Sequence, residues 1–400
     1  MKIIEINGTN YASTGNIAIN IAKAARDKGH TVLTCCKKSR KSLEFDIENQ
    51  IYIGSRIERV ICETICEITG YKDSLNIIGT WKFINKLRRI KPDLIHLHIV
   101  HDTYINISML FKYLKKKNIP IVWTFHDCYA LTGQCVYFDQ AQCNKWQTGC
   151  NNCPQLRRYP NSLFFDRTSG LWNKKKELFT GINNLTIVTP SDWMANLVKK
   201  SYLKDYPVKV INNGINLNAF KPIDSRFREK HNLQDKKIVL GVCYIWNSRK
   251  GLSDFIWLSK MLSDDYKVVL VGTNDNIDTC LPDNVLSIHR TYDQKELAEI
   301  YTTADVLINP TYEDNFPTVN IESLACGTPV ITYKTGGSPE SLNEDCGSVI
   351  EKGNQNKLLK EIKRVCETKP YTKQACIEQA SKYDMYEKFD EYVDLFEKLV

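Results

Sequence analysis

The stretch Asn309–Tyr333, NPTYEDNFPTVNIESLACGTPVITY, decides the fold class of this chain. It begins where Asp305–Asn309 (DVLIN) ends, and the apolar and β-branched side chains of that segment are typical of a buried strand. Pro317 suits the first turn of a helix, and Gly327 suits its end. Pro329–Tyr333 has the composition of a second strand. This order predicts two parallel strands joined by a right-handed helical crossover.

Two carboxylates bracket the entrance of the predicted helix. Asp314 lies in the loop before it, and Glu322 lies eight positions later, inside it. The run around Glu322 is largely apolar, where a carboxylate is costly unless it has a partner. The pair is therefore the first candidate for a functional site.

The same alternation extends over the whole chain. Strands are predicted in the first half at 2–6, 31–35, 94–98, 121–124, 185–189 and 208–212, and in the second half at 237–242, 267–271, 305–309 and 329–333. Helices are predicted at 16–28, 56–69, 80–91, 109–117, 191–200, 252–263, 297–303, 355–367 and 372–398. Asn213-Gly214 is a turn signal that ends the first half. The pattern predicts an α/β protein with two similar halves.

Length and composition agree with two soluble domains. The chain has 400 residues, of which 42% are hydrophobic and 25% charged. We find no apolar run near the roughly 18–20 residues that a membrane span needs. The N-terminus, MKIIEINGTN, has too short an apolar run for a signal peptide. We therefore expect a cytoplasmic protein.

The net charge of +8 fits phosphate-bearing small molecules or an anionic membrane surface. We find no nucleic-acid motif and expect no nucleic-acid partner. The predicted helices at 56–69, 80–91 and 109–117 mix basic and apolar residues. They are either amphipathic surface helices with solvated lysines or a face that rests on anionic lipid, on the inner side of the membrane.

Four of the fifteen cysteines lie close together in the sequence, at Cys135, Cys143, Cys150 and Cys153. A CxxC pair with two further cysteines within 20 residues resembles a structural zinc loop, although the spacing is not that of a standard zinc finger. Free or redox-active thiols and disulfides are the alternatives. In each case we expect the group to hold together a long insertion without helical periodicity.

Three devices in the second half indicate a nucleotide-sugar ligand. Arg249-Lys250 offers positive charge beside a loop glycine. Gly336-Gly337 lets the backbone approach an anion and direct amides at it. Asp314 and Glu322 can accept hydrogen bonds from sugar hydroxyls. An anion joined to a polyol is what a nucleotide-sugar presents.

Two features of the first half point to the same edge of a sheet. Phe125-His126-Asp127 follows the predicted strand at 121–124, and open α/β sheets bind ligands at the carboxyl ends of their strands. The first strand leads into a polar loop ending at Gly15, an opening typical of nucleotide-handling sheets. The loop lacks the GxGxxG pattern, so a dinucleotide fold is not supported.

These residues together resemble the retaining GT-B glycosyltransferases of family 4, the large group of bacterial polysaccharide and lipopolysaccharide transferases. That family has two acids eight positions apart, followed by small residues, a glycine and a Pro-Val strand. Asp314, Glu322 and SLACGTPV match this order, with Asp at the first position and Glu313 as the neighbouring candidate. Lys250 matches the family lysine, and Arg249 matches the family arginine only by its role.

Other segments extend the resemblance over nearly the whole chain. TGGSPE, with Gly336, Gly337 and Ser338, is similar to the loop that contacts the donor diphosphate. Gly15 resembles the glycine of the first-domain loop, and His126 the histidine near the transferred sugar. The segment NNGIN at 212–216 is similar to the family's interdomain segment. FHDCYALTGQC and GCNNCP resemble a Cys-rich subgroup.

The resemblance implies two Rossmann-like parallel-sheet domains facing across a cleft. Residues 1–212 and 383–400 would form the acceptor-binding domain, with a Cys-rich insertion at 128–153 and a last helix that crosses back onto it. Residues 213–382 would form the nucleotide-sugar-binding domain.

The implied activity is sugar transfer from a nucleotide-sugar to a glycan or lipid-linked acceptor, with retention at the anomeric carbon and without a catalytic metal. His126, Asp314 and Glu322 would act at the reacting sugar, while the basic pair and glycine loop would hold the diphosphate. The alternatives are a GT-B-shaped nucleotide-sugar epimerase or phosphorylase acting on the same donor, and a non-catalytic sugar-binding subunit.

Overall fold

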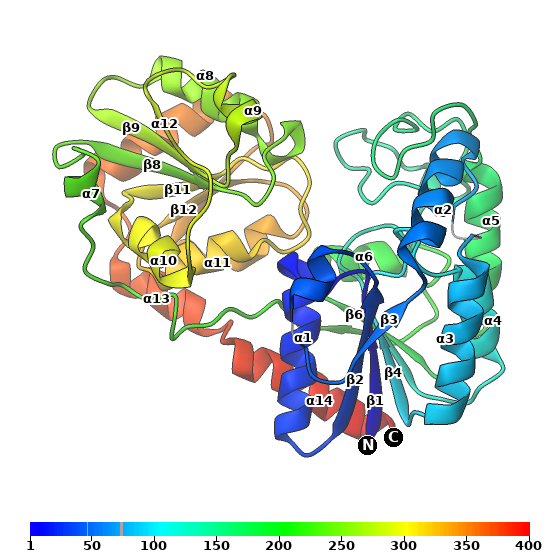
Figure 1. The fold of residues 1–400 in the computed structure, drawn as a ribbon. Helices are drawn as coiled ribbons and strands as arrows, with labels where there is room; N and C mark the ends of the chain where they lie inside the picture. Colours follow the sequence, from blue (N-terminus) through cyan, green and yellow to red (C-terminus); the bar gives the residue numbers. More distant parts are fainter. Residues whose placement is uncertain (46, 73–74) are drawn as a thin grey trace. The chain divides into compact units, whose positions relative to one another are not determined.

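A computed structural model describes residues 1–45, 47–72 and 75–400. The chain forms two compact units, one made of Met1–Asn212 with Lys388–Val400 and the other of Asn213–Glu387. Each unit contains one parallel sheet with helices on both faces (Figure 1). The predicted α/β class with two Rossmann-like parallel sheets is confirmed.

The sheet of unit 1 has seven parallel strands in the order β3-β2-β1-β4-β5-β6-β7. Their bounds are β1 Lys2–Ile6, β2 Thr31–Lys37, β3 Gln50–Ile53, β4 Leu94–Leu97, β5 Ile121–Thr124, β6 Leu185–Thr189 and β7 Val208–Val210. The order reverses between β1 and β4, and open α/β sheets bind ligands outside the carboxyl ends of the strands at such a point.

The helices of unit 1 cover both faces of this sheet (Figure 1). They are α1 Ala12–Asp27, α2 Arg56–Thr69, α3 Ile77–Ile90, α4 Ile107–Lys115, α5 Thr168–Phe179 and α6 Asp192–Lys199, with 3-10 turns at Lys41–Glu44 and Lys145–Gln147. The last helix, α14 (Met385–Leu399), returns to unit 1. There Lys28, the residue directly after α1, forms an ion pair of 2.9 Å with Asp394 on α14.

The sheet of unit 2 has six parallel strands in the order β10-β9-β8-β11-β12-β13. Their bounds are β8 Lys237–Val242, β9 Tyr266–Val271, β10 Val285–Ile288, β11 Val306–Asn309, β12 Val330–Tyr333 and β13 Gly347–Ile350. The helices are α7 Phe227–Lys230, α8 Leu252–Met261, α9 Asp275–Asp278, α10 Gln294–Thr303, α11 Thr318–Ala325, α12 Gln355–Thr368 and α13 Lys373–Ser381, with 3-10 turns at Ser248–Lys250 and Ser338–Ser341. Here the strand order reverses between β8 and β11.

Helix α5 was not predicted, and two of the predicted helices differ from the structure by more than three residues at one end or by a break. The first begins at Ala12 rather than at 16, so Gly15 lies inside α1 and not at the end of a loop. The predicted helix at 372–398 is two helices, α13 and α14. The chain breaks between them because the amide of Ile215 donates to the carbonyl of Tyr383, and the amide of Met385 donates to the carbonyl of Ile215, each at 2.9 Å.

Among the described residues, no helix combines the length and the apolar character that a membrane crossing needs.

Candidate functional site

Lys250 and Asp314 meet at the switch point of the unit 2 sheet. Lys250 ends the 3-10 turn that follows β8, and Asp314 lies in the loop that follows β11. The Lys250 ammonium and the Asp314 carboxylate are 2.5 Å apart. The structure thus brings together two residues that lie 64 positions apart in the sequence.

The neighbouring residues, Arg249 and Glu313, tie the same two loops together. The Arg249 guanidinium donates to the backbone carbonyl of Glu313 at 2.8 Å. The backbone carbonyl of Arg249 accepts from the amide of Tyr312 at 2.8 Å. Glu313 itself is buried, with 3% of its surface exposed. Arg249 therefore fixes the loop that carries the acids.

The glycine loop after β12 packs directly on the backbone of Asp314. Gly336 has a φ of +55°, and a Cβ placed on it would lie 1.7 Å from the carbonyl oxygen of Asp314. The amide of Gly337 donates to the same oxygen at 3.4 Å. Only glycine can occupy position 336 in this backbone, because any side chain would collide with the acid loop.

Ser338 and Asn320 anchor this loop to the core of unit 2. The hydroxyl of Ser338 is fully buried; it accepts from the Asn320 amide at 3.1 Å and lies 2.7 Å from the hydroxyl of Thr332. Asn320 lies on α11 and also accepts at 2.9 Å from the side chain of Asn309, the last residue of β11. The Ser338 side chain therefore contributes to the site by fixing the backbone of the glycine loop.

Glu322, also on α11, has different neighbours. Its carboxylate accepts a hydrogen bond of 2.9 Å from the hydroxyl of Tyr301, a fully buried residue of α10. Burial raises the pKa of Glu322, and hydrogen bonds from Tyr301 and Thr318 offset part of that rise. Tyr301 is the partner that this partly buried carboxylate needs, and no pattern in the sequence pointed to it.

These contacts bring Arg249, Lys250, Glu313, Asp314 and the glycine loop together at the carboxyl ends of β8, β11 and β12, whereas Gly15, also predicted to bind the donor, lies in unit 1. Two cationic side chains and the amides of a glycine loop can bind oxyanions. The carboxylates can accept hydrogen bonds from hydroxyl groups. The local chemistry therefore suits a ligand that contains both phosphate and sugar.

His126 in unit 1 follows β5 and takes part in a chain of hydrogen bonds. Its Nε2 lies 2.8 Å from Nδ1 of His98, which follows β4. The Nε2 of His98 lies 3.0 Å from the carboxylate of Glu5 on β1. The Glu5 carboxylate also contacts Nδ1 of His96 at 3.0 Å. The LIHLH segment predicted only a strand, so the link from its histidines to His126 was missed.

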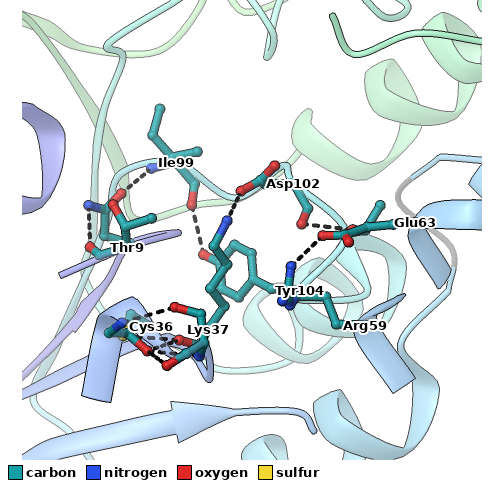
Figure 2. Close-up of polar contacts among 12 residues, drawn as sticks. Thr9, Cys36, Lys37, Arg59, Glu63, Ile99, Asp102 and Tyr104 are labelled. Carbon is teal, nitrogen blue, oxygen red and sulfur yellow. Dashed lines mark hydrogen bonds and ion pairs between the residues drawn. The ribbon is translucent and has the colours of Figure 1, made fainter. Parts of the chain in front are cut away.

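A second polar group lies in the loop after β4. Figure 2 shows the Lys37 ammonium paired with the Asp102 carboxylate, beside the hydroxyl of Tyr104, which donates to the carbonyl of Ile99 at 2.7 Å. Tyr159 donates to the other oxygen of Asp102 at 2.8 Å. Burial opposes ionisation of Asp102, but Lys37 keeps its pKa below the ordinary value.

The backbone of this loop is strained. Asp102 and Thr103 have φ values of +83° and +56°, which is costly for non-glycine residues and most costly for a β-branched one. His101 beside them lies 2.9 Å from the carboxylate of Asp127. Strain of this kind is common where a loop must hold polar groups for a ligand.

Gly15 is needed for packing in α1. A Cβ on Gly15 would lie 2.9 Å from the backbone carbon of Asn10 and 3.2 Å from the carbonyl oxygen of Thr9. The loop after β1 can therefore lie directly on α1 only because position 15 lacks a side chain.

The four clustered cysteines line one small cavity, together with Phe138, Trp146 and Thr168. All four are free thiols. The amide of Gly133 donates to the sulfur of Cys150 at 3.2 Å. Burial raises the pKa of Cys135 to about 12 and also raises that of Cys150 and Cys153. No three of these four sulfur atoms all lie within 4.8 Å of one another, so the cysteines do not form a closed set of metal ligands among the described residues.

Helix α2 presents an apolar face to solvent. Its exposed side chains are Ile57, Val60, Ile61, Ile65 and Ile68, with Ile57 exposed over 75% of its surface. Ile77, Ile78 and Trp81 at the start of α3 are also exposed, as are Phe164 and Phe165. The loop of these phenylalanines lies against α2, because the amide of Leu163 donates to the carbonyl of Glu67 at 2.7 Å.

Two known protein families match this chain. The family described as Glycosyltransferase Family 4 matches residues 14–219, just over half of the chain. The family described as Glycosyl transferases group 1 matches residues 224–383. The matches fall on unit 1 and unit 2 respectively, apart from residues at the boundary.

Individual relatives are more distant. WcaC of Escherichia coli (strain K12), which bears the name of a colanic acid biosynthesis glycosyl transferase, is 26% identical over 322 residues, covering 78% of each chain. The N,N'-diacetylbacillosaminyl-diphospho-undecaprenol alpha-1,3-N-acetylgalactosaminyltransferase of Campylobacter jejuni is 28% identical over 178 residues, covering 42% of this chain and 47% of the relative.

The fold is also that of solved structures. Anabaena HepE, solved in complex with UDP, superimposes with a TM-score of 0.70 at 16% identity, over 100% of both chains. The same protein has been solved with UDP-glucose.

Proposed function

Because the chain belongs to Glycosyltransferase Family 4, we propose that it is a retaining glycosyltransferase that moves a sugar from a nucleotide-sugar to a glycan or lipid-linked acceptor in cell-surface polysaccharide biosynthesis. Unit 2 binds the donor, and unit 1 binds the acceptor. The names of WcaC and of the Campylobacter relative support the polysaccharide and the lipid-linked acceptor.

The observation that carries this proposal is the group around Lys250 and Asp314. It lies outside the strand ends where the unit 2 sheet order reverses, which is where α/β sheets bind ligands. Lys250, Arg249 and the amides after β12 stabilise the diphosphate as its bond to the anomeric carbon breaks and its negative charge grows. Asp314 and Glu322 accept hydrogen bonds from hydroxyl groups of the donor. Glu313, whose side chain is buried, is the alternative to Asp314.

The acceptor hydroxyl forms the new bond on the face from which the diphosphate leaves, so the anomeric configuration is retained. Its proton passes to the departing phosphate oxygen. His126 lies near the transferred sugar and accepts a hydrogen bond from one of its hydroxyls. No step requires a protein nucleophile or a metal-bound intermediate.

Release of nucleoside diphosphate tests this function. The full chain is incubated with UDP-, GDP- and ADP-sugars, with and without a polyprenyl-diphosphate-linked sugar or a polysaccharide fragment. We expect release from one donor, and only when an acceptor is present. Epimerised donor without acceptor would identify an epimerase, and donor binding without turnover under any condition would identify a sugar-binding subunit.

We also propose that Cys135, Cys143, Cys150 and Cys153 hold a structural zinc ion. Their shared cavity and the amide hydrogen bond to Cys150 support this, because structural zinc sites use four cysteines and amide donors stabilise thiolates. Binding must draw the sulfurs closer and displace their protons. Metal analysis should find one zinc per chain, which Cys153→Ser loses and Cys280→Ser, a change at an exposed cysteine outside the cluster, retains. Wild-type protein without zinc would refute the site.

The apolar face of α2 supports peripheral attachment to a membrane. A lipid-linked acceptor would be reached from such a surface, and an exposed apolar helix face is a common way to lie in the bilayer interface. In vesicle flotation, Ile57→Glu with Ile61→Glu should abolish binding, while Tyr292→Glu, at a residue of unit 2 that is 98% exposed, should not. Wild-type protein that fails to float with anionic vesicles at low salt would refute attachment.

A further inference from the structure

Glu5, His98 and His126 form a continuous chain of polar contacts through the interior of unit 1. Glu5 and His98 are almost fully buried, with 1% and 2% of their surfaces exposed. The chain runs from the β1/β4 switch point to His126, which lines a small cavity after β4 and β5. The protonation state of Glu5 determines which atom donates in each hydrogen bond of the chain.

Glu5 sets the direction of the first bond. Burial alone would raise the pKa of Glu5, but the contacts with His96 and His98 lower it to about 2. Glu5 is therefore an ionised carboxylate, which can only accept hydrogen bonds. The Nε2 of His98, 3.0 Å away, must carry a proton and donate it to this carboxylate.

His98 passes the direction on to His126. Burial and the neighbouring His96 lower the pKa of His98 to about 4, so its ring is neutral and its Nδ1 carries a lone pair. That lone pair faces Nε2 of His126 at 2.8 Å, and the two rings are inclined by only 13°. The Nε2 of His126 must therefore carry a proton. Burial also lowers the pKa of His126 well below its ordinary value, so its Nδ1 is unprotonated.

We propose that Glu5 and His98 are positioning residues that hold His126 in the Nε2–H tautomer, so that its Nδ1 serves as a hydrogen-bond acceptor for a hydroxyl of the transferred sugar. The proposal rests on the proposed function for its ligand, but the tautomer itself does not. In a neutral histidine, the bond made by one ring nitrogen determines what the other can offer.

The opposite tautomer is disfavoured by the same contacts. An Nδ1–H form of His126 would set two lone pairs against each other across 2.8 Å inside the protein. Both ring nitrogens would then lack a hydrogen-bond partner inside the protein, which is unfavourable.

His96 provides an internal control. It shares the Glu5 carboxylate, but its Nε2 lies 2.9 Å from the hydroxyl of Thr124 and not near His126. A change at His96 removes one partner of Glu5 and leaves the chain through His98 in place.

A metal ion would give the reverse result. The ligand atoms of Glu5, His96 and His98 lie within 4.8 Å of one another. A cation bound to Nε2 of His98 would force the proton onto Nδ1, which would then donate to His126. His126 would have to accept on Nε2 and carry its own proton on Nδ1. The tautomer of His126 therefore distinguishes the two arrangements.

The test is a long-range proton–nitrogen correlation spectrum of the full chain labelled with 15N-histidine, at pH 7. The signals of His126 are identified by their loss in His126→Asn. We expect a protonated Nε2 and an unprotonated Nδ1. A protonated Nδ1, an imidazolium or an average of both tautomers would overturn the proposal.

Two variants test the cause. His98→Phe keeps a ring but removes the acceptor, and should convert His126 to a mixture of tautomers. His96→Phe should leave the single Nε2–H tautomer. A folded His98→Phe protein that keeps the single tautomer would overturn the role of His98, and if that variant does not fold, the wild-type spectrum decides.

Activity separates this proposal from the proposed function. In the transfer assay, His98→Phe should lower kcat/KM for transfer about tenfold, because His126 then offers its Nδ1 lone pair to the transferred sugar only part of the time, and should leave the affinity for free nucleoside diphosphate, which lacks that sugar, unchanged. A wild-type protein with the Nε2–H tautomer but without transfer activity would refute the function and not the tautomer. An active protein with the Nδ1–H tautomer would refute the tautomer and not the function.

Discussion

The partners of Asp314 and Glu322 in unit 2 determine how available each carboxylate is to a ligand. Asp314 is paired with Lys250 at 2.5 Å, whereas Glu322 accepts from the neutral hydroxyl of Tyr301 at 2.9 Å. A donor diphosphate would compete with Asp314 for Lys250. The carboxylate of Glu322 faces no such competition and is the firmer candidate for hydroxyl binding.

Replacing Glu322 by Gln should weaken donor binding at least tenfold, which corresponds to about 1.4 kcal/mol. The amide has the same size but only one acceptor oxygen. Tyr301→Phe removes the internal hydrogen bond to this side chain but keeps the carboxylate, so it should have a smaller effect. Calorimetric titration with the nucleotide-sugar provides both dissociation constants. Unchanged affinity in folded Glu322→Gln would contradict the assignment.

The histidine chain makes the stability of the protein depend on pH. The unfolded chain protonates its histidines below about pH 6.5, whereas His98 in the native state does so only near pH 4. The unfolded state therefore binds more protons in this window, and the free energy of unfolding must fall as the pH falls through it. Urea unfolding should show a loss of roughly 1–3 kcal/mol from pH 6.5 to 4. His98→Phe should flatten this slope; an equal slope in the variant would contradict the account.

The sequence predicted individual site residues but not the side chains that hydrogen-bond to them. Glu322 and Lys250 could be selected from spacing and residue type alone. Tyr301 lies 21 positions from Glu322, and Glu5 lies 93 positions from His98, so only the folded chain reveals either contact. Isolated histidines in a buried strand are most often structural, and nothing in LIHLH distinguishes His98 from His96.

The loops at strand ends hold the donor residues, and each depends on close backbone packing. The glycine loop after β12 lies on the acid loop after β11, and the turn after β8 lies on the same loop through Arg249. Displacing any one of these three loops would therefore shift the donor-binding groups on the other two.

Gly336→Ala should destabilise the protein and weaken donor binding at least tenfold, because its Cβ would lie 1.7 Å from the Asp314 carbonyl oxygen. Gly353→Ala is the matched control. Gly353 has a similar backbone, with φ of +76°, but a Cβ there would be 3.7 Å from its nearest neighbour. It should cost only the backbone penalty of about 1–2 kcal/mol. If Gly336→Ala and Gly353→Ala lowered the unfolding temperature and the donor affinity equally, the close contact at Gly336 would have no special role.

Elements with strong periodicity were predicted well, and short edge elements were missed. The prediction of 56–69 coincides with α2, because its N-cap Ser55 and C-terminal Gly70 mark both ends. Strands β3, β10 and β13 were not predicted. Each has only four residues, and each lies at or near a sheet edge, where part of the strand faces solvent and an apolar run is not required.

The chain leaves unit 1 and returns to it only through its last residues. Residues Lys388–Val400 belong to unit 1, and Phe389, Tyr392, Val393 and Phe396 of this segment are buried. His96 packs against Tyr392 and Phe396, with ring centroids 5.4 and 5.1 Å apart. The C-terminal segment therefore supports the strand that carries the histidine chain.

Deleting residues 388–400 should destabilise unit 1 selectively. The deletion exposes the apolar surface that the buried side chains of this segment cover. Hydrogen exchange should rise in β1, β4 and α1 and remain unchanged in β8, β9 and β11. Equal loss of protection in both units would contradict the division of the chain.

The central claim is that the loops of unit 2 bind a nucleotide-sugar. Hydrogen exchange of the full chain, with and without each member of a panel of UDP-, GDP- and ADP-sugars, tests it most directly. For one donor we expect slower exchange in three segments, 243–251, 310–322 and 334–341. Lys250→Met should remove this protection, and Lys260→Met, which changes an exposed lysine of α8, should leave it. Protection confined to other segments, or absent with every nucleotide-sugar, would contradict the account.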